Sequence, residues 1–565
     1  MNKRAARLFL VSRNWYNKAM EKFTQEQLNT MDKDALVTLV MSCMDRIRQL
    51  TNENAEQTRE LNHKIDNLTE TIALLTQRSF GKKSEVKLYS GDQLTIYDMG
   101  INEAEVTLAG RIPREPEIEE VVIKEHKRAK RKGKREEDLA GLPVTIVNHV
   151  LDEERLNELF PEGYSKLPDE VYKKLEVKPA VFEVKEHHIA VYKGKNGKIA
   201  KGNHPKEAIS NSVATPSILA FVSNAKYVNA IPLYRLEQEF LRNDISISRQ
   251  VMAHWMIYIA EHYLSLIHYR LIDEIKRSSV VHADETPVSV VKDGREGMHN
   301  SYMWVYRNGG LKDNHHAVVY DFHKTRKKEA PAEFLRGFKG TLVTDGYQVY
   351  HSLENDKSTE FTVAGCWAHA KRKFAEIIKA LGEEKAKGTV AYEAVGQIQY
   401  LYHRDNELMC LKPGERHRKR QVLIKPIVDD FFRWAKEIKP QVSSSSATGK
   451  ALNYCLNQEK HLRVFLDNPE IPLDNNAAER AIRPFCVGKK NWKLIDTVHG
   501  AEASAIIYSI VETCKLNGLN IFYYLKHVLT EMPKYMDDSN QDFIEALLPW
   551  SDELPDECRK KSNTT

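Results

Sequence analysis

Two acidic residues have the spacing and surroundings needed for phosphoryl-transfer chemistry. Asp284 lies in VVHADETP, inside an apolar run typical of a β-strand, and Asp345 closes a second such run, LVTD, directly before Gly346. If these strands are neighbours in one sheet, the two carboxylates lie close together and repel each other. A divalent metal ion removes that conflict, and Mg²⁺ prefers hard oxygen ligands. The pair therefore predicts a site for Mg²⁺ or Mn²⁺.

A third carboxylate would complete a site for two metal ions that span one scissile phosphate. The candidate is Glu479, in DNNAAERAIRP. This stretch is typical of a capped helix that begins at Asp474 or Asn475 and is stopped by Pro484. The three acids together would then be both the metal ligands and the catalytic residues.

The surroundings of Glu479 leave alternatives open. Asp474 and Glu502 are rival acids, and Glu479 with Arg483, four residues later, could form an ordinary surface ion pair. Basic residues nearby suit a polyanionic substrate. The candidate DNA contacts in this stretch are Arg480, Arg483, Lys489 and Lys490.

The elements that must position these acids begin near residue 278. Three strands are predicted first, in SSVVHADETPVSVV, SYMWVYRN and HHAVVYDFHK, followed by a short helix in APAEFLRGF. Two more strands are predicted in GTLVTDGYQVY and STEFTVAGCW, and a helix follows in HAKRKFAEIIKAL. This order is that of a ribonuclease-H-like α/β domain, although many α/β folds share pieces of it. About a hundred mostly helical residues between Trp367 and Pro472 separate the second acid from the third, and they predict an insertion into this domain.

Two further segments are candidates for DNA contact. The stretch KEHKRAKRKGKR, residues 124–135, carries eight Lys or Arg against one Glu and could neutralise phosphates, or it could be a solvated linker. Its candidate contacts are Lys127, Arg128, Lys130, Arg131 and Lys132.

Two helices around a turn are predicted in PLYRLEQEFLRN and RQVMAHWMIYIAEHYL, with Ser248 as the N-cap of the second. Helix-turn-helix geometry would put Arg249 and Gln250 near the start of a recognition helix, and two packed helices without DNA contact are the alternative.

The N-terminal region has a heptad pattern that predicts a self-associating coiled coil. The alternative is an amphipathic helix packed on its own domain. The helix is expected to stop near RSFGKKSE, residues 78–85, at Gly81. The seam consists of Val40, Met44, Ile47, Thr51, Asn54, Thr58, Leu61, Ile65, Leu68, Ile72 and Leu75.

The composition is that of an ordinary globular protein. The 565 residues are 42% apolar and 29% charged, the net charge of +5 is too small to identify a partner, and no run of eighteen apolar residues indicates a membrane span. Seven scattered Cys without a CxxC pair predict neither disulfides nor a Cys-built zinc site, so a reducing cytoplasm is expected. Cys366 and His369, in CWAH, are only two possible ligands, which favours a structural role.

Several long motifs, in this order along the chain, are similar to those of the bacterial DDE transposases of the insertion sequence 66 family. They are RSFGKKSE, KYVNAIPLYRLEQEF, HADETPV, LVTDGY, GCWAHAKRKF, LDNNAAERAIRPFCVGKKNW and LNGLNIFYYLKHVL. The resemblance implies a ribonuclease-H-like core interrupted by a helical insertion, with an N-terminal coiled coil and small α+β DNA-binding modules. It also implies Asp284, Asp345 and Glu479 as catalytic acids, cleavage and strand transfer of double-stranded DNA, and a nucleoid-associated protein.

One segment departs from that family. Its members resemble one another in a Cys-rich zinc module, whereas residues 141–205 keep part of the frame, in KLEVKPAVFEVKEHHIAVY, without any Cys. Zinc is therefore not expected.

The sequence predicts six parts along the chain. They are a coiled-coil region at 1–85, a linker at 86–140, the Cys-free module at 141–205, a helical region at 206–272, the catalytic domain at 273–510 with its insertion at about 381–465, and a helical tail at 511–565.

The resulting prediction is a DDE transposase that uses two Mg²⁺ or Mn²⁺ ions, acts as a homo-oligomer and works with accessory proteins of its element. The alternative is a catalytically silent DNA-binding protein, such as a decayed transposase that represses its own ends. A structural coiled-coil scaffold is a third possibility, but it leaves the paired acids unexplained.

Overall fold

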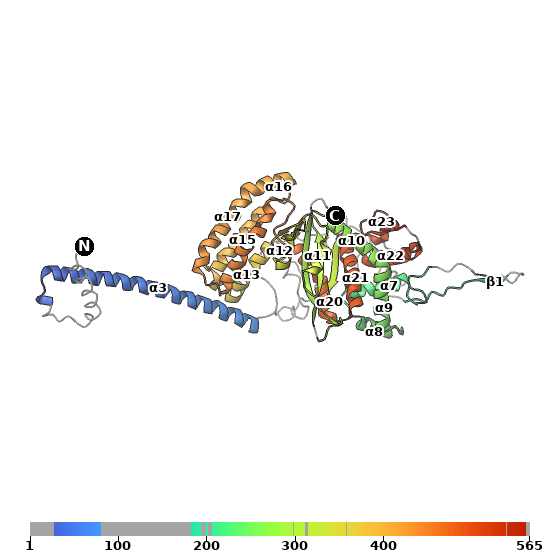
Figure 1. The fold of residues 1–565 in the computed structure, drawn as a ribbon. Helices are drawn as coiled ribbons and strands as arrows, with labels where there is room; N and C mark the ends of the chain where they lie inside the picture. The colour runs from blue at the N-terminus through green and yellow to red at the C-terminus, as the bar shows by residue number, and fades with distance from the viewer. Residues whose placement is uncertain are drawn as a thin grey trace, which may run out of the picture. The chain divides into compact units, whose positions relative to one another are not determined.

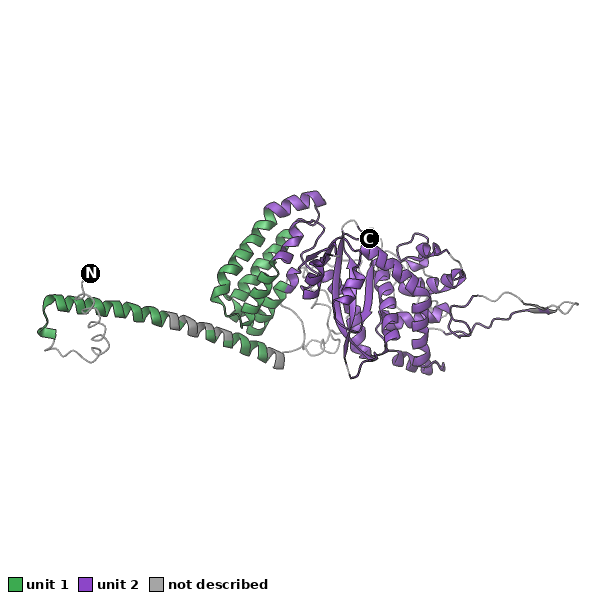
Figure 2. Ribbon diagram, viewed as in Figure 1, with its two compact units in different colours: residues 1–83, 370–407, 423–459 green, residues 84–369, 408–422, 460–565 purple. Residues whose placement is uncertain are grey.

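The protein was analysed as a computed structural model. It describes residues 28–80, 182–193, 199–201, 206–297, 299–310, 313, 315–357, 359–537 and 540–560. The predictions for the basic block at 124–135 and for most of the module at 141–205 lie outside these residues. Two compact units were found, formed by residues 1–83, 370–407 and 423–459, and by residues 84–369, 408–422 and 460–565 (Figure 2). Within the described ranges, no helix combines the length and apolar character needed to cross a bilayer.

The first unit is helical. Its N-terminal helix α3 (Lys33–Phe80) contains the heptad pattern, and the apolar seam residues at both ends of it are exposed, with Met44 at 51% and Ile72 at 62%. The other main helices are α15 (Val390–Asn406), α17 (Lys425–Ile438) and α18 (Ala447–Asn457), and α17 packs against both α15 and α18 (Figure 1).

The second unit contains a mixed sheet in the order β5-β4-β3-β6-β7. The strands are β3 (Val280–Lys292), β4 (Asn300–Asn308), β5 (Val318–His323), β6 (Thr341–Val343) and β7 (Thr362–Ala364). The first three pair antiparallel, whereas β6 runs parallel to both β3 and β7. A further short strand, β8 (Ile495–Thr497), pairs parallel with the end of β3.

Helices cover the sheet and supply its core. They include α10 (Ser265–Arg277), α20 (Asn476–Trp492) and α21 (Val498–Leu516), all of which contact the sheet strands. Trp304 and Tyr306 point to one face of β4, and Met303 and Val305 point to the other. All four are completely buried, so both faces of this strand are covered. Complete burial of the Met303 and Val305 side chains contributes roughly 1.5–3 kcal/mol each to the free energy of unfolding.

The edge strand β5 is capped by side chains of α21. The Ser509 hydroxyl accepts a hydrogen bond from the Tyr320 N–H at 2.7 Å. The Thr513 hydroxyl accepts one from the Val318 N–H at 3.0 Å and donates one to the Val318 carbonyl at 3.2 Å. Because an exposed edge would leave these backbone groups unpaired, α21 closes the sheet on this side.

The two helices predicted around Ser248 are present as α8 (Leu233–Arg242) and α9 (Arg249–Ile259). The prediction of Ser248 as N-cap is confirmed, because its side chain accepts a hydrogen bond from the Val251 N–H at 3.4 Å. DNA contact by this pair of helices stays a prediction.

The prediction that Pro484 ends the helix carrying Glu479 is wrong. Helix α20 runs through Pro484 and ends at Trp492. Proline removes one backbone hydrogen bond from a helix interior. Here Ile482 and Phe485, on either side of it, are buried in the core, and this packing outweighs the local cost.

Candidate active site

The first two predicted acids lie just beyond the paired stretch of two adjacent parallel strands, Asp284 inside β3 and Asp345 after the end of β6. His282 of β3 is opposite Val343 of β6, and Asp284 and Asp345 each come two residues after that pair. The Asp284 Oδ1 accepts a hydrogen bond from the Glu285 N–H, and the Asp345 Oδ1 accepts one from the Tyr347 N–H, both at 2.9 Å. Both acids are partly buried, and each carboxylate is held by a backbone hydrogen bond.

The third predicted acid, Glu479, lies in the first turn of α20 and is 9% exposed. The buried Asn475 side chain fixes this turn to β3. Its amide nitrogen donates to the Ala283 carbonyl at 2.8 Å, and its Oδ1 lies 2.9 Å from the His282 Nδ1. Because these two partners directly precede Asp284, the amide sets the position of α20 relative to that acid.

The carboxylates of this region act on one another electrostatically. Burial raises the pKa of Asp284 well above its usual value, and the negative charges of Glu285, Asp345 and Glu479 raise it further. Burial also raises the pKa of Glu285, with Asp345 adding to the effect. A carboxylate cluster of this kind is stabilised by a bound cation. Its donors are all carboxylate oxygens, which fit Mg²⁺ or Mn²⁺.

The two rival acids have other surroundings. The Asp474 carboxylate accepts a hydrogen bond from the Asn476 N–H at 3.1 Å, at the start of α20. Glu502 is exposed on α21. Neither is among the charges that raise the pKa of Asp284, whereas Glu479 is.

A second possible donor group shares Glu479. The side-chain donor atoms of Cys366, His369 and Glu479 all lie within 4.8 Å of one another, and the His369 Nε2 is 3.6 Å from the Glu479 Oε1. Sequence reasoning counted only the first two of these groups. The Cys366 sulfur accepts a hydrogen bond from the Asn475 N–H at 3.2 Å, and burial raises the pKa of this thiol. The hydrogen bond to the start of α20 supports a structural role for Cys366.

The predicted DNA contacts of α20 differ in their surroundings. Arg480 and Lys490 are exposed, and Arg483 is partly buried. Lys489 instead donates to the Pro287 carbonyl at 2.7 Å and to the Thr286 hydroxyl at 3.3 Å. It therefore fastens α20 to β3 just beyond Asp284.

The remaining predicted DNA contacts lie elsewhere. Arg249 and Gln250 are exposed at the start of α9, and the Arg249 guanidinium lies 5.6 Å from the centre of the Tyr234 ring. Lys127, Arg128, Lys130, Arg131 and Lys132 lie outside the described residues.

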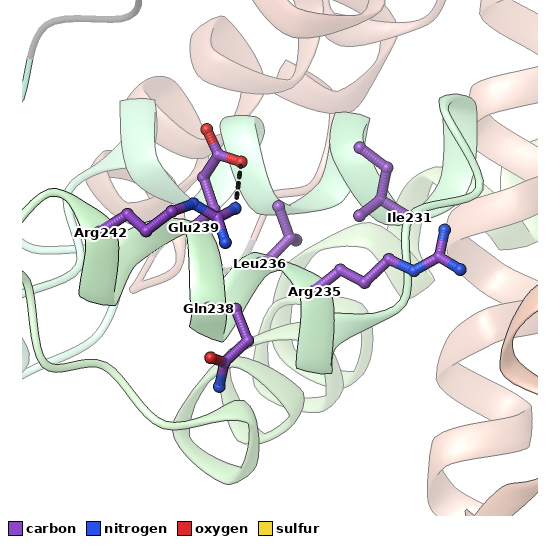
Figure 3. Close-up of a pocket in the computed structure, with 6 residues that line it drawn as sticks. All are labelled: Ile231, Arg235, Leu236, Gln238, Glu239 and Arg242. Atoms are coloured by element: carbon purple, nitrogen blue, oxygen red, sulfur yellow. Dashed lines mark hydrogen bonds and ion pairs between the residues drawn. The ribbon is translucent and has the colours of Figure 1, made fainter.

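A pocket lies along α8 (Figure 3). An ion pair at 3.3 Å joins Arg242 to Glu239 beside it. Its lining residues are Ile231, Arg235, Leu236, Gln238, Glu239 and Arg242. Since α8 and the residue preceding its cap supply the whole lining, the pocket is a surface feature of one helix and none of the three acids lines it.

Sequence reasoning missed three residues that meet at the acid pair, namely Glu285, Arg326 and Tyr347. Arg326 forms an ion pair with Glu285, with its Nε 2.9 Å from the Glu285 Oε1. Its guanidinium carbon lies 3.9 Å from the centre of the Tyr347 ring. Glu285 and Tyr347 could have been suspected from their places directly beside Asp284 and after Asp345-Gly346. Arg326, in the basic run HKTRKK, carried no such signal.

Comparisons with known proteins give one consistent result. The family model described as "Transposase IS66 family" matches residues 211–503, "IS66 C-terminal element" matches 509–550, and "Transposase C of IS166 homeodomain" matches 67–147. The chain is 30% identical over 372 residues to uncharacterized protein y4qI of Sinorhizobium fredii, which covers 64% of this chain and 66% of that protein. It is 27% identical over 390 residues to uncharacterized protein y4jD of the same organism, covering 67% of this chain and 74% of that protein.

Proposed function

The chain belongs to the IS66 family of transposases, and from this premise we propose that it cuts DNA at the ends of a mobile element and joins the freed end to target DNA. The reaction is metal-dependent phosphoryl transfer, with Asp284, Asp345 and Glu479 as the metal-binding acids. The observation that carries the proposal is geometric: Asp284 and Asp345 each lie two residues beyond the paired His282 and Val343 of adjacent strands, and Glu479 is buried in the first turn of the helix fastened to β3. The raised pKa of Asp284, caused by burial and by the other carboxylates, agrees with this placement. A protein that only bound DNA would gain nothing from holding repelling carboxylates together.

The strand order supports a ribonuclease-H-like core. Three antiparallel strands followed by two parallel ones, in the order β5-β4-β3-β6-β7, are the arrangement expected for it. In that arrangement the first and fourth strands of the domain, β3 and β6, are neighbours. This is the condition under which Asp284 and Asp345 can share a metal ion.

The donor set fits the proposed chemistry. Bound Mg²⁺ or Mn²⁺ would stabilise the charge that develops on the attacking and leaving oxygens of the phosphodiester. The chain itself holds the acids in place. The amide of Asn475 sets the position of α20 against β3, and Lys489 fastens the same helix about four turns later. Arg480 is exposed directly after Glu479, where a cation would attract a DNA phosphate.

Cleavage at paired ends requires at least two protomers. The exposed apolar positions of α3 support pairing of two chains as a coiled coil. We therefore propose a homo-oligomer that works on bacterial DNA in the cytoplasm, together with accessory proteins of its element.

The experiment is Mn²⁺- or Mg²⁺-dependent nicking of a plasmid that carries candidate element ends. Wild type is compared with Asp345→Asn and with Glu502→Gln, a control acid that is exposed on α21. We expect nicking by wild type and by Glu502→Gln, and none by Asp345→Asn, while all three bind the DNA equally. Equal nicking by Asp345→Asn would exclude the assignment.

Binding without nicking by any of the proteins would favour the alternative function, a silent DNA-binding protein at the element ends. The same assay in an extract of cells that carry the whole element separates that outcome from a missing accessory protein. Nicking that appears only in the extract supports the enzyme, and continued absence supports the repressor.

A further inference from the structure

We propose that Arg326 is a positioning residue that holds the two aspartates of the site at a fixed separation. With Glu285 and Tyr347 it forms a clamp between β3, which carries Asp284, and the turn after β6, which carries Asp345. We call these three residues the Arg326 clamp. The inference rests on the proposed function and deepens it, because it names what presets the metal-binding geometry.

The first half of the clamp is the ion pair with β3. Glu285 directly follows Asp284 on the strand, and its side chain is only 3% exposed. The Nε and one terminal nitrogen of Arg326 both donate to its Oε1, with the Nε at 2.9 Å. Since Arg326 lies in the loop after β5, this pair ties that loop to the residue beside the first aspartate.

The second half is the contact with the turn that follows β6. The Arg326 guanidinium carbon lies 3.9 Å from the centre of the Tyr347 ring. The Tyr347 hydroxyl donates to the Arg326 carbonyl at 2.9 Å, and the Tyr347 N–H donates to the Asp345 carboxylate at 2.9 Å. Tyr347 therefore holds Arg326 through its side chain and Asp345 through its backbone.

Together these contacts form an unbroken path from one aspartate to the other. It passes from Asp284 to its neighbour Glu285, then through Arg326 and Tyr347 to Asp345, and each step is a covalent bond, a hydrogen bond, an ion pair or a ring contact. Partners that orient metal ligands in this way set the affinity of the ligands for the metal. The clamp keeps two repelling carboxylates in place before the metal ion binds.

The clamp requires arginine rather than a generic cation. The planar guanidinium directs two N–H groups to the Glu285 oxygen in its plane and presents its face to the Tyr347 ring. A lysine would keep the charge, but its single nitrogen could not both donate two hydrogen bonds in one plane to the Glu285 oxygen and stack a flat face on the Tyr347 ring. Arg326→Lys therefore tests geometry, and Arg326→Ala tests geometry and charge together.

The experiment measures Mn²⁺ binding to the full-length, DNA-free protein by calorimetry, alongside nicking as a function of Mn²⁺ concentration. We expect Arg326→Lys to weaken Mn²⁺ binding about 10-fold and Arg326→Ala up to about 100-fold, in the range seen when partners of metal ligands are replaced. Tyr347→Phe keeps the ring but removes the hydroxyl donor, and it should also weaken Mn²⁺ binding. The DNA affinity should stay that of wild type.

The matched control is Arg295→Lys. Arg295 forms a comparable ion pair with Asp293, with its Nε 2.8 Å from the carboxylate, in the turn between β3 and β4 and away from the acids. This variant should bind Mn²⁺ as wild type does. If Arg326→Ala does not fold, Arg326→Lys and Tyr347→Phe still decide the question.

Three results would overturn the clamp. One is wild-type Mn²⁺ affinity in both Arg326→Lys and Tyr347→Phe. Another is weaker DNA binding by Arg326→Lys with unchanged Mn²⁺ binding, which would make Arg326 a DNA contact. The third is unchanged Mn²⁺ binding by Asp345→Asn, or none by wild type, which would remove the proposed function itself and the clamp with it.

Discussion

Asp284→Asn should stabilise the metal-free protein and remove its response to metal. The folded-state pKa of Asp284 is raised above its usual value, so the carboxylate gives up its proton less readily in the folded than in the unfolded state. The charge therefore lowers the free energy of unfolding as the pH rises past the usual aspartate value towards the folded one. At neutral pH, a neutral amide of the same shape avoids this cost.

The size of the expected effect is the increase in the free energy of unfolding when Mn²⁺ binds. A ligand that binds only the folded state at a concentration 100 times its Kd adds about 2.7 kcal/mol to the free energy of unfolding. With about 2.1 cal/mol/K of unfolding entropy per residue, the roughly 290 described residues of the second unit give a Tm shift of about 1.6 °C per kcal/mol. Saturating Mn²⁺ should thus raise the wild-type Tm by about 4–5 °C, whereas Asp284→Asn should show almost no shift.

The assay is differential scanning calorimetry at pH 7.5 and pH 5, in EDTA and in Mn²⁺. In EDTA at pH 7.5, Asp284→Asn should melt above wild type, and the gap should narrow at pH 5 as the native carboxyl takes up its proton. Asp496→Asn, an exposed aspartate paired with Lys292, serves as the control and should change neither result. A variant that is less stable than wild type in EDTA, or that keeps the Mn²⁺ shift, would refute the reasoning.

Three further predictions follow from named contacts. Burial lowers the pKa of His282 to about 4, so the neutral imidazole contributes about 3 kcal/mol to the free energy of unfolding above pH 6.5, and this is lost as the pH falls towards 4. His282→Asn should remove this acid sensitivity in denaturant unfolding measured against pH. Equal sensitivity in the variant and in wild type would contradict a buried neutral His282. Glu479→Gln should lower the nicking rate more than about 100-fold, since a direct ligand matters more than its partners, and equal rates for Glu479→Gln and Glu502→Gln would exclude Glu479. Lys490→Gln should reduce the slope of log DNA affinity against log salt concentration by about 0.9. Lys489→Gln should leave that slope unchanged, because Lys489 is hydrogen-bonded to β3. The reverse pattern would show that Lys489 is the phosphate contact.

Parts of the site could be predicted from sequence because they depend on strand register. Once two apolar runs pair as adjacent parallel strands, acids at matching positions just beyond the paired stretch lie beside each other. Asp284 and Asp345 follow this rule, two residues beyond the paired His282 and Val343. The start of α20 near Asn475 was likewise marked by its polar residues.

Other features depend on packing that no local pattern contains. Pro484 signals a helix end, but the buried residues around it keep α20 helical to Trp492. The Asn475 side chain caps no N–H of its own helix and instead binds β3, about 190 residues earlier in the chain. Arg326 reaches Glu285 only because the loop after β5 lies beside β3 and the turn after β6, which is a property of the folded sheet.

Iron-directed cleavage of the protein backbone tests whether Asp284, Asp345 and Glu479 share one metal site. Fe²⁺ replaces Mn²⁺ in oxygen-ligand sites, and with peroxide and ascorbate it cuts the chain close to where it is bound. We expect cuts near residues 284, 345 and 479 in the same sample, suppressed by excess Mg²⁺ and absent in Asp345→Asn. Cuts confined to other positions, or cuts near only one of the three acids, would contradict a shared metal site.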